Sequence, residues 1–368
     1  MALKERQAAL RKLQEVRGSK VLVHFLSDRR IAQGIPITGM NTQLAGESYP
    51  FVHEHLRTLG HHEKVDFFLY TSGGHLDSVW AFVRLFRSFG KRFSVLVPMR
   101  ALSAGTLLCL GADEIVMGEA AQLSPIDPTT ANAFNPREKD NKPMPISVED
   151  VTSYLDLARG DEKGGETRGG AGLKSDEHIL EVFKGLIGQV HPLALGNVKR
   201  VYSQIRVIAR KLLELHLSGE DSEERIGRVV STLTEELFSH THLICRAEAV
   251  DILGEDVVVL PSPEEEAAMW ELYEQYAEFF ELKHTFNLKD WLGQDQEKEL
   301  EAVGGAIESE EMSHLFKAMS KIRQLPELPQ GMQMQIAPGQ RVPLVPGLPT
   351  RVAIEPIREG WYTNEEGV

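Results

Sequence analysis

Short apolar runs alternate with segments of helical periodicity over residues 21–117, and this alternation is the clearest pattern in the chain. The apolar runs are almost continuous, which is typical of strands that are buried on both faces of a sheet. They lie at residues 21–26, 65–70, 93–97 and 115–117. Helices are predicted between them, over 45–60, after Gly74 and over 104–112. Strand and helix in alternation predict an α/β core whose parallel sheet carries helices on both faces.

The pattern changes after residue 128, where polar segments and helical periodicity replace the apolar runs. A loop is predicted over 130–147, and a mobile, Gly-rich and charged loop over 159–172. Further helices are predicted over 148–158, about 177–217 with a break near His191, about 221–237, and 262–283. The last 45 or so residues hold seven prolines and are expected to be extended at best.

These changes divide the chain into four predicted parts. An N-terminal helix (1–20) precedes a ClpP/crotonase-like core domain (21–260) that carries an insertion at about 130–237. A helical C-terminal extension (261–322) and a Pro-rich tail (323–368) follow.

Composition narrows the class of protein without naming a function. The formal net charge of -14 argues against a broad surface for nucleic acid or anionic membrane. No apolar run approaches the roughly 18 to 20 residues that span a bilayer, and the charged N-terminal segment does not resemble a signal peptide. We therefore expect a cytoplasmic protein. Cys109 and Cys245 form no C-x-x-C pair, which fits a reducing compartment, with one disulfide as the alternative.

Three segments could carry chemistry. The glycine pair Gly73–Gly74 ends a strand, where bare backbone N–H groups could bind an oxyanion. Ser103 lies between a strand and an apolar helix, the place of a nucleophilic serine. Asp127 lies between two prolines and could orient a histidine base. Each also has a plain structural interpretation: a helix start, a serine N-cap and a turn residue.

Taken in order, these segments resemble a known family. The runs TSGGHLDSVWAFVRLFRSFG, FSVLVPMRALSAGTLLCLGADEIVMG and AQLSPIDP are similar to the ClpP/crotonase superfamily, and most similar to the serine dehydrogenase proteinase (SDH-type) family. The resemblance covers roughly residues 20–260. It implies a ClpP/crotonase-like α/β fold, a serine-type protease that cleaves peptides or proteins without a cofactor or metal, and a homo-oligomer.

The resemblance also implies roles for particular residues. Ser103 matches the nucleophile, and the oxyanion-hole backbone is matched by Gly73, Gly74 and Ala104. Asp127 and a later turn, residues 239–249, would supply the other two catalytic groups, with His240 or His242 as the base and a slight preference for His240. His191 is a rival base. One departure is Ser72, which stands where a proline is usual before the glycine pair.

Two other classes of function stay open at this point. A crotonase-like acyl-CoA enzyme would use the same backbone donors without a serine nucleophile. A silent scaffold would keep the fold and show no serine reactivity. The sequence identifies neither the substrate nor any unfoldase partner. A metal site is not expected, because His53 and His55 are two residues apart and do not share a helix face.

Overall fold

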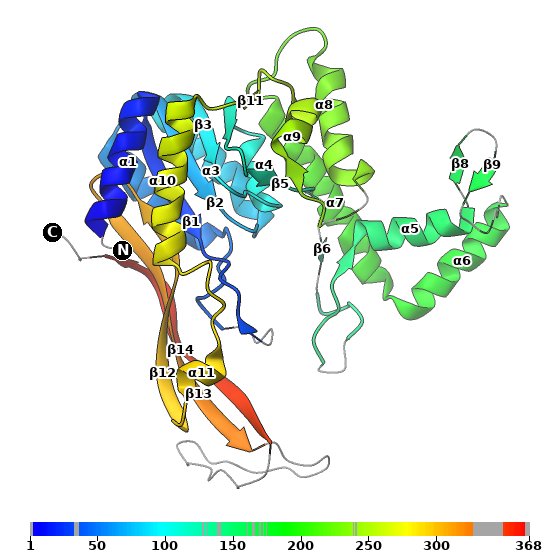
Figure 1. Cartoon of the computed structure of the whole chain (residues 1–368). Helices are drawn as coiled ribbons and strands as arrows, with labels where there is room; N and C mark the ends of the chain where they lie inside the picture. The colour runs from blue at the N-terminus through cyan, green and yellow to red at the C-terminus, as the bar shows by residue number, and fades with distance from the viewer. Residues whose placement is uncertain are drawn as a thin grey trace.

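A computed structural model describes most of the chain (Figure 1). The described residues are 3–32, 37–126, 129–130, 132–137, 141–159, 161–163, 166–168, 171, 173, 175–237, 239, 241–326 and 349–364. An eight-stranded sheet forms the centre, in the order β11-β4-β3-β2-β1-β12-β13-β14. The strands are β1 (Lys20–Leu26), β2 (His62–Tyr70), β3 (Gly90–Val97), β4 (Glu114–Met117), β11 (Val258–Val259), β12 (Glu297–Glu308), β13 (Ser313–Pro326) and β14 (Thr350–Thr363).

The sheet has a parallel half and an antiparallel half. Strands β11, β4, β3, β2 and β1 run parallel to one another. Strands β12, β13 and β14 continue the sheet in antiparallel order beyond β1. The predicted α/β fold with a parallel sheet and flanking helices is therefore confirmed.

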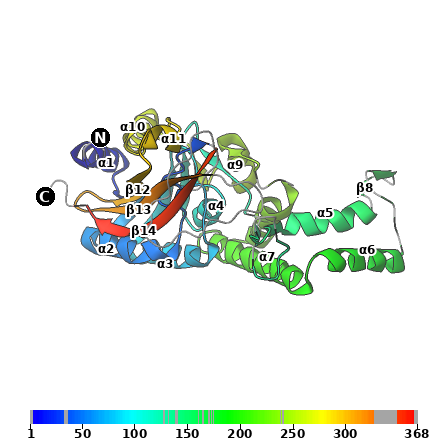
Figure 2. The same cartoon turned by 90° about the horizontal axis from the view of Figure 1, so that it is seen from below.

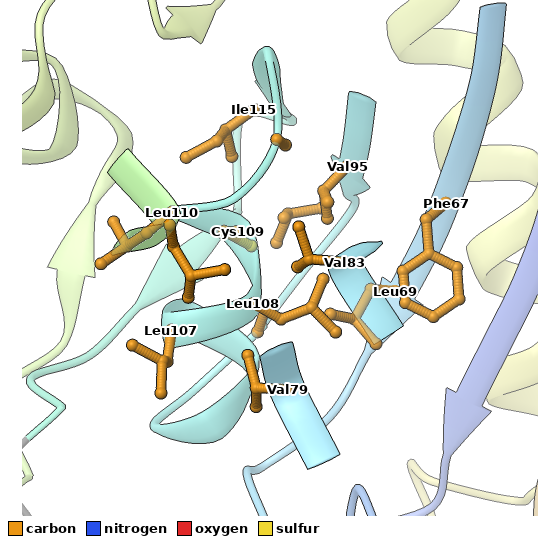
Figure 3. Packing of buried hydrophobic residues seen from close by; sticks show 14 of the residues in the cluster. Phe67, Leu69, Val79, Val83, Val95, Leu107, Leu108, Cys109, Leu110 and Ile115 are labelled. Carbon is orange, nitrogen blue, oxygen red and sulfur yellow. The ribbon is translucent and has the colours of Figure 1, made fainter. Parts of the chain in front are cut away.

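Side chains of the parallel strands alternate between two apolar layers, which is why their sequences are almost continuously apolar. Phe67, Val95 and Ile115 pack on one face against α3 (Val79–Phe89) and α4 (Ala104–Cys109) (Figure 3). Phe68, Leu96 and their neighbours pack on the other face. There they meet α1 (Leu3–Arg17) and α10 (Pro263–Phe279), which lie side by side in Figure 1.

Further helices cover the first of these faces and project from it. Figure 2 shows α5 and α6 extending away from the sheet beyond α7. These helices are α2 (Tyr49–Leu59), α5 (Val148–Arg159), α6 (Asp176–Gln189), α7 (Pro192–Leu213), α8 (Ser222–Ser231) and α9 (Arg246–Leu253). The short helix α11 (Leu288–Leu292) packs instead against β12 and β13. Short strands pair locally as β5 (Gln122–Leu123) with β10 (Ile244–Cys245), β6 (Thr129–Thr130) with β7 (Ile146–Ser147), and β8 (Asp161–Lys163) with β9 (Glu166–Arg168).

The C-terminal part differs from its prediction. Residues 261–322 were expected to be helical, and α10 and α11 are, but β12 and most of β13 also lie within this range. The Pro-rich tail contains β14, which pairs with β13 along its length. Pro356 is tolerated because β14 is an edge strand with a bulge beside it. The two-residue periodicity of β12 is not visible in the sequence, because charges are frequent and the Gly304–Gly305 pair interrupts it.

Other features bear on the remaining predictions. Cys109 is buried, Cys245 is exposed, and both are free thiols. Within the described ranges, no helix is long and apolar enough to cross a membrane. The same ranges contain no group of three or more His, Cys, Asp or Glu side chains placed to hold a metal ion.

Candidate active site

Ser103 lies in a sharp turn at the start of the buried helix α4. Its backbone has φ 50° and ψ -111°, a left-handed conformation that non-glycine residues rarely adopt. Such strain persists only where the surrounding structure holds it, and it is common at functional sites. The turn follows β3 at the carboxyl edge of the parallel strands, the position expected for an exposed nucleophile.

Two buried hydroxyls hold this turn in place. The backbone N–H of Ser103 donates to Oγ of Ser124 (2.7 Å). The N–H of Ser124 donates to Oγ1 of Thr106 (3.0 Å), and that hydroxyl donates to the carbonyl of Ala101 (2.7 Å). Ser124 is 3% exposed and Thr106 is fully buried, so water does not compete for these bonds. No sequence pattern marked Ser124 or Thr106 for this role.

The glycine turn packs directly against Ser103. A Cβ atom built on Gly73 would lie 3.0 Å from Cβ of Ser103 and 3.2 Å from the carbonyl of Leu102. Gly73 also has φ +117°, which a larger residue rarely adopts. The backbone N–H of Leu102 donates to the carbonyl of Thr71 (3.0 Å) and ties the two turns together. The sheet edge therefore brings the predicted glycine pair and the predicted serine into contact.

The backbone N–H groups of this edge divide into bonded and free donors. The N–H of Gly73 donates to Oγ1 of Thr71 (3.0 Å), and the N–H of Ser103 is bonded to Ser124. Among bonds between described residues, none uses the N–H of Gly74 or Ala104 as donor. Two free donors beside one serine hydroxyl are the arrangement that an oxyanion hole requires.

A histidine turn lies beside the segment that supports Ser103. Strand β10 pairs antiparallel with β5, with Ile244 opposite Leu123. The ladder ends at Ile244, so His242 lies two residues before its first pair. Nε2 of His242 lies 2.8 Å from Oε1 of Glu248, and the two side chains are 39% and 33% exposed. Glu248, which the sequence analysis did not single out, can therefore orient this imidazole.

The remaining predicted partners of Ser103 are Asp127, His240 and the rival base His191. Asp127 and His240 lie outside the described residues. His191 caps α7, where its Nδ1 accepts from the N–H of Leu193 (3.1 Å), and its ring stacks on Phe134. These contacts give His191 a structural role.

Comparison with protein families matches the N-terminal part of the chain to one family. Residues 1–141 match the family model of the ClpP-like SDH-type serine proteinases. The matched part includes Gly73, Gly74, Ser103 and Asp127, whereas the histidine turn lies beyond it. The resemblance seen in the sequence is thus confirmed, and the match to SDH-type proteinases supports a protease.

Curated relatives and solved structures add little on substrate. Two uncharacterized proteins of Methanocaldococcus jannaschii are each 26% identical to the chain, one over 72% of this chain and 77% of its own length, the other over 34% and 42%. Among solved structures, a membrane-bound stomatin-specific protease with a substrate peptide is 13% identical over 59% of this chain and 71% of its own, with a TM-score of 0.34. An enoyl-CoA hydratase from Polaromonas sp. JS666 is 16% identical over 59% and 90%, with a TM-score of 0.24.

Proposed function

We propose that the chain is a serine-type peptide hydrolase in which Ser103 is the nucleophile. The observation that carries this proposal is the left-handed turn at Ser103, packed against the Gly73–Gly74 turn. A serine that merely capped a helix would not need this strained backbone, since N-cap residues usually have extended angles. The SDH-type match to residues 1–141 supports the same reaction class.

In the proposed reaction, Oγ of Ser103 attacks the carbonyl carbon of a peptide bond while a base takes its proton. The carbonyl oxygen becomes an oxyanion, which the N–H groups of Gly74 and Ala104 stabilise. The intermediate then collapses, the C–N bond breaks, and the amine leaves with the proton from the base. Water, deprotonated by the same base, hydrolyses the acyl-enzyme and restores the Ser103 hydroxyl.

The base in this proposal is a histidine of the 239–243 turn, His240 or His242, with Asp127 as its carboxylate partner. The pairing of β5 with β10 supports this choice, because it holds that turn beside the Ser124 segment. If His242 is the base, Glu248 takes the place of Asp127, since a carboxylate bonded to Nε2 leaves Nδ1 as the basic nitrogen.

Intact-mass labelling with a fluorophosphonate probe tests the nucleophile. We expect one adduct on the wild-type chain and none on Ser103→Ala. The matched control is Ser203→Ala, which removes an exposed hydroxyl on α7 that bonds only within its own helix. Labelling of Ser103→Ala to the wild-type extent, or no adduct on folded wild type, would falsify the proposal.

The base is tested with His240→Ala and His242→Ala in the same assay. Because a serine hydroxyl is a weak nucleophile without its base, we expect one of the two to lower the labelling rate by about a hundredfold or more. His191→Ala serves as the control and should label at the wild-type rate. If both turn variants react normally, the histidine assignment is wrong.

A further inference from the structure

A short segment crosses from the end of β1 to the glycine turn. Residues 42–44, here called the strap, contact the antiparallel half of the sheet at one end and the proposed oxyanion turn at the other. Leu44 is fully buried and belongs to the main apolar core. The strap carries no side chain that the proposed chemistry uses, so its contacts need a different explanation.

At the active-site end, the backbone of Leu44 bonds to both sides of the glycine pair. Its N–H donates to the carbonyl of Gly73 (2.9 Å), and its carbonyl accepts from the N–H of His75 (2.7 Å). The fit leaves no space, because a Cβ atom on Gly74 would lie 2.1 Å from the Leu44 carbonyl oxygen. The strap and the glycine turn therefore pack backbone against backbone.

The bond to Gly73 has a directional consequence. The carbonyl of Gly73 and the N–H of Gly74 belong to one peptide group, which is planar and normally trans. In a trans peptide these two bonds point in opposite directions. Because the Gly73 carbonyl points at Leu44, the N–H of Gly74 points away from Leu44 and stays free for another acceptor.

At its other end the strap is fixed to a bulge in the antiparallel half. The carbonyl of Gly304 accepts from the N–H of Ser27 (2.7 Å) and from the hydroxyl of Thr42. Gly304 lies where the register between β12 and β13 shifts. A Cβ atom on Gly304 would lie 2.1 Å from the carbonyl oxygen of Gly39 and 2.6 Å from Cγ2 of Thr42, so the strap packs closely against the bulge.

We propose that Leu44 is a positioning residue of the hydrolytic site, whose backbone N–H orients the Gly73–Gly74 peptide so that the Gly74 N–H faces the oxyanion. The Thr42–Gly304 bond would hold Leu44 against the glycine turn. This inference rests on the proposed function and adds to it a dependence of catalysis on the β12–β13 bulge.

The direct test removes only the Leu44 N–H. The full-length chain is made with the α-hydroxy analogue of leucine at position 44, which replaces the amide by an ester and keeps the side chain. The control carries the α-hydroxy analogue of glutamine at position 43, because the Gln43 N–H donates no hydrogen bond to a described residue. Readouts are the fluorophosphonate labelling rate, and kcat and KM on a peptide ester.

We expect the ester at Leu44 to lower the labelling rate and kcat by about tenfold or more and to leave KM within about twofold, because the oxyanion donor acts mainly in the transition state. The Gln43 ester should behave as wild type. If the Leu44 ester reacts like the Gln43 ester, the inference is wrong while the proposed function stands. If wild type itself is not labelled, both fall.

A second pair of variants covers the case in which the ester at Leu44 does not fold. Thr42→Val removes the hydroxyl bonded to Gly304 and keeps the shape, whereas Thr42→Ser keeps the hydroxyl. We expect a lower kcat for Thr42→Val and recovery in Thr42→Ser, with similar melting temperatures. Wild-type kcat in both variants would overturn the role of the strap.

Discussion

Replacing Gly74 by alanine is expected to lower peptide hydrolysis by about a hundredfold or more, the usual effect of losing an oxyanion donor. The added methyl group would lie 2.1 Å from the carbonyl oxygen and 2.5 Å from the nitrogen of Leu44. Both are backbone atoms, so no rotation of a side chain can relieve the overlap. The glycine turn and the strap must separate, which moves the Gly74 N–H.

The same substitution should also lower the free energy of unfolding by about 1–3 kcal/mol, as overpacking in a core does. Gly196→Ala on α7 is the matched control, because nothing lies within 4 Å of the added methyl group. That change should raise stability by about 0.5–1 kcal/mol and leave hydrolysis unchanged. Hydrolysis by folded Gly74→Ala within about twofold of wild type would show that Gly74 is not an oxyanion donor.

Mild acid is expected to destabilise the fold through two buried histidines. His24 is fully buried among the rings of Phe67, Phe82 and Trp361, and burial lowers its pKa to about 3. Neither of its ring nitrogens bonds to another described residue. Protonation in the folded chain would therefore place a charge among aromatic carbons.

The second histidine belongs to a bonded cluster beside β14. Nδ1 of His55 lies 2.8 Å from Oγ of Ser309, and Nε2 lies 3.0 Å from Nδ1 of His314. Burial first, and then the nearby His314 and His24, lower the pKa of His55 to about 3. Burial also lowers the pKa of His314, against the opposing effect of Glu54, whose carboxylate lies 3.8 Å away.

The direction of the pH effect follows from these lowered pKa values. Below the ordinary pKa of 6.5 the unfolded chain binds protons that the folded chain does not take up until about pH 3. Stability is therefore lost as the pH falls through this window. Between about pH 7 and about pH 5, His24 and His55 should each remove about 2 kcal/mol from the free energy of unfolding. Glu265, whose lowered pKa starts from 4.5, titrates below that range.

Urea unfolding followed by circular dichroism at several pH values measures this effect. His24→Leu should reduce the loss of stability between about pH 7 and about pH 5 by about 2 kcal/mol, since it replaces one titrating ring by an apolar side chain. His284→Leu is the control, because this ring is exposed in the segment that follows α10. An unfolding free energy that stays constant from about pH 7 to about pH 5 would contradict the buried, neutral state of both rings.

Part of the fold could be predicted from the sequence because local pattern reports burial directly. The continuous apolar runs at 21–26 and 93–97 lie within β1 and β3, and the Gly73–Gly74 and Ser103 segments come at the ends of buried strands. The carboxyl ends of parallel strands lie at one edge of the sheet, which is why the glycine pair and the serine are neighbours in the structure. Their sequence also indicated the family.

Only the tertiary structure decided which groups support the glycine pair and Ser103. The bonds from Ser103 to Ser124 and from Leu44 to Gly73 join residues that are distant in the chain and have ordinary types, so no local pattern marks them. Strand β14 was hidden because Pro356 and frequent charges are unfavourable inside a sheet yet acceptable at its edge. The sequence by itself determined where a nucleophile could stand, because strand ends and glycines are local features. Which backbone N–H groups remain free depended on hydrogen bonds that form only when distant segments pack together.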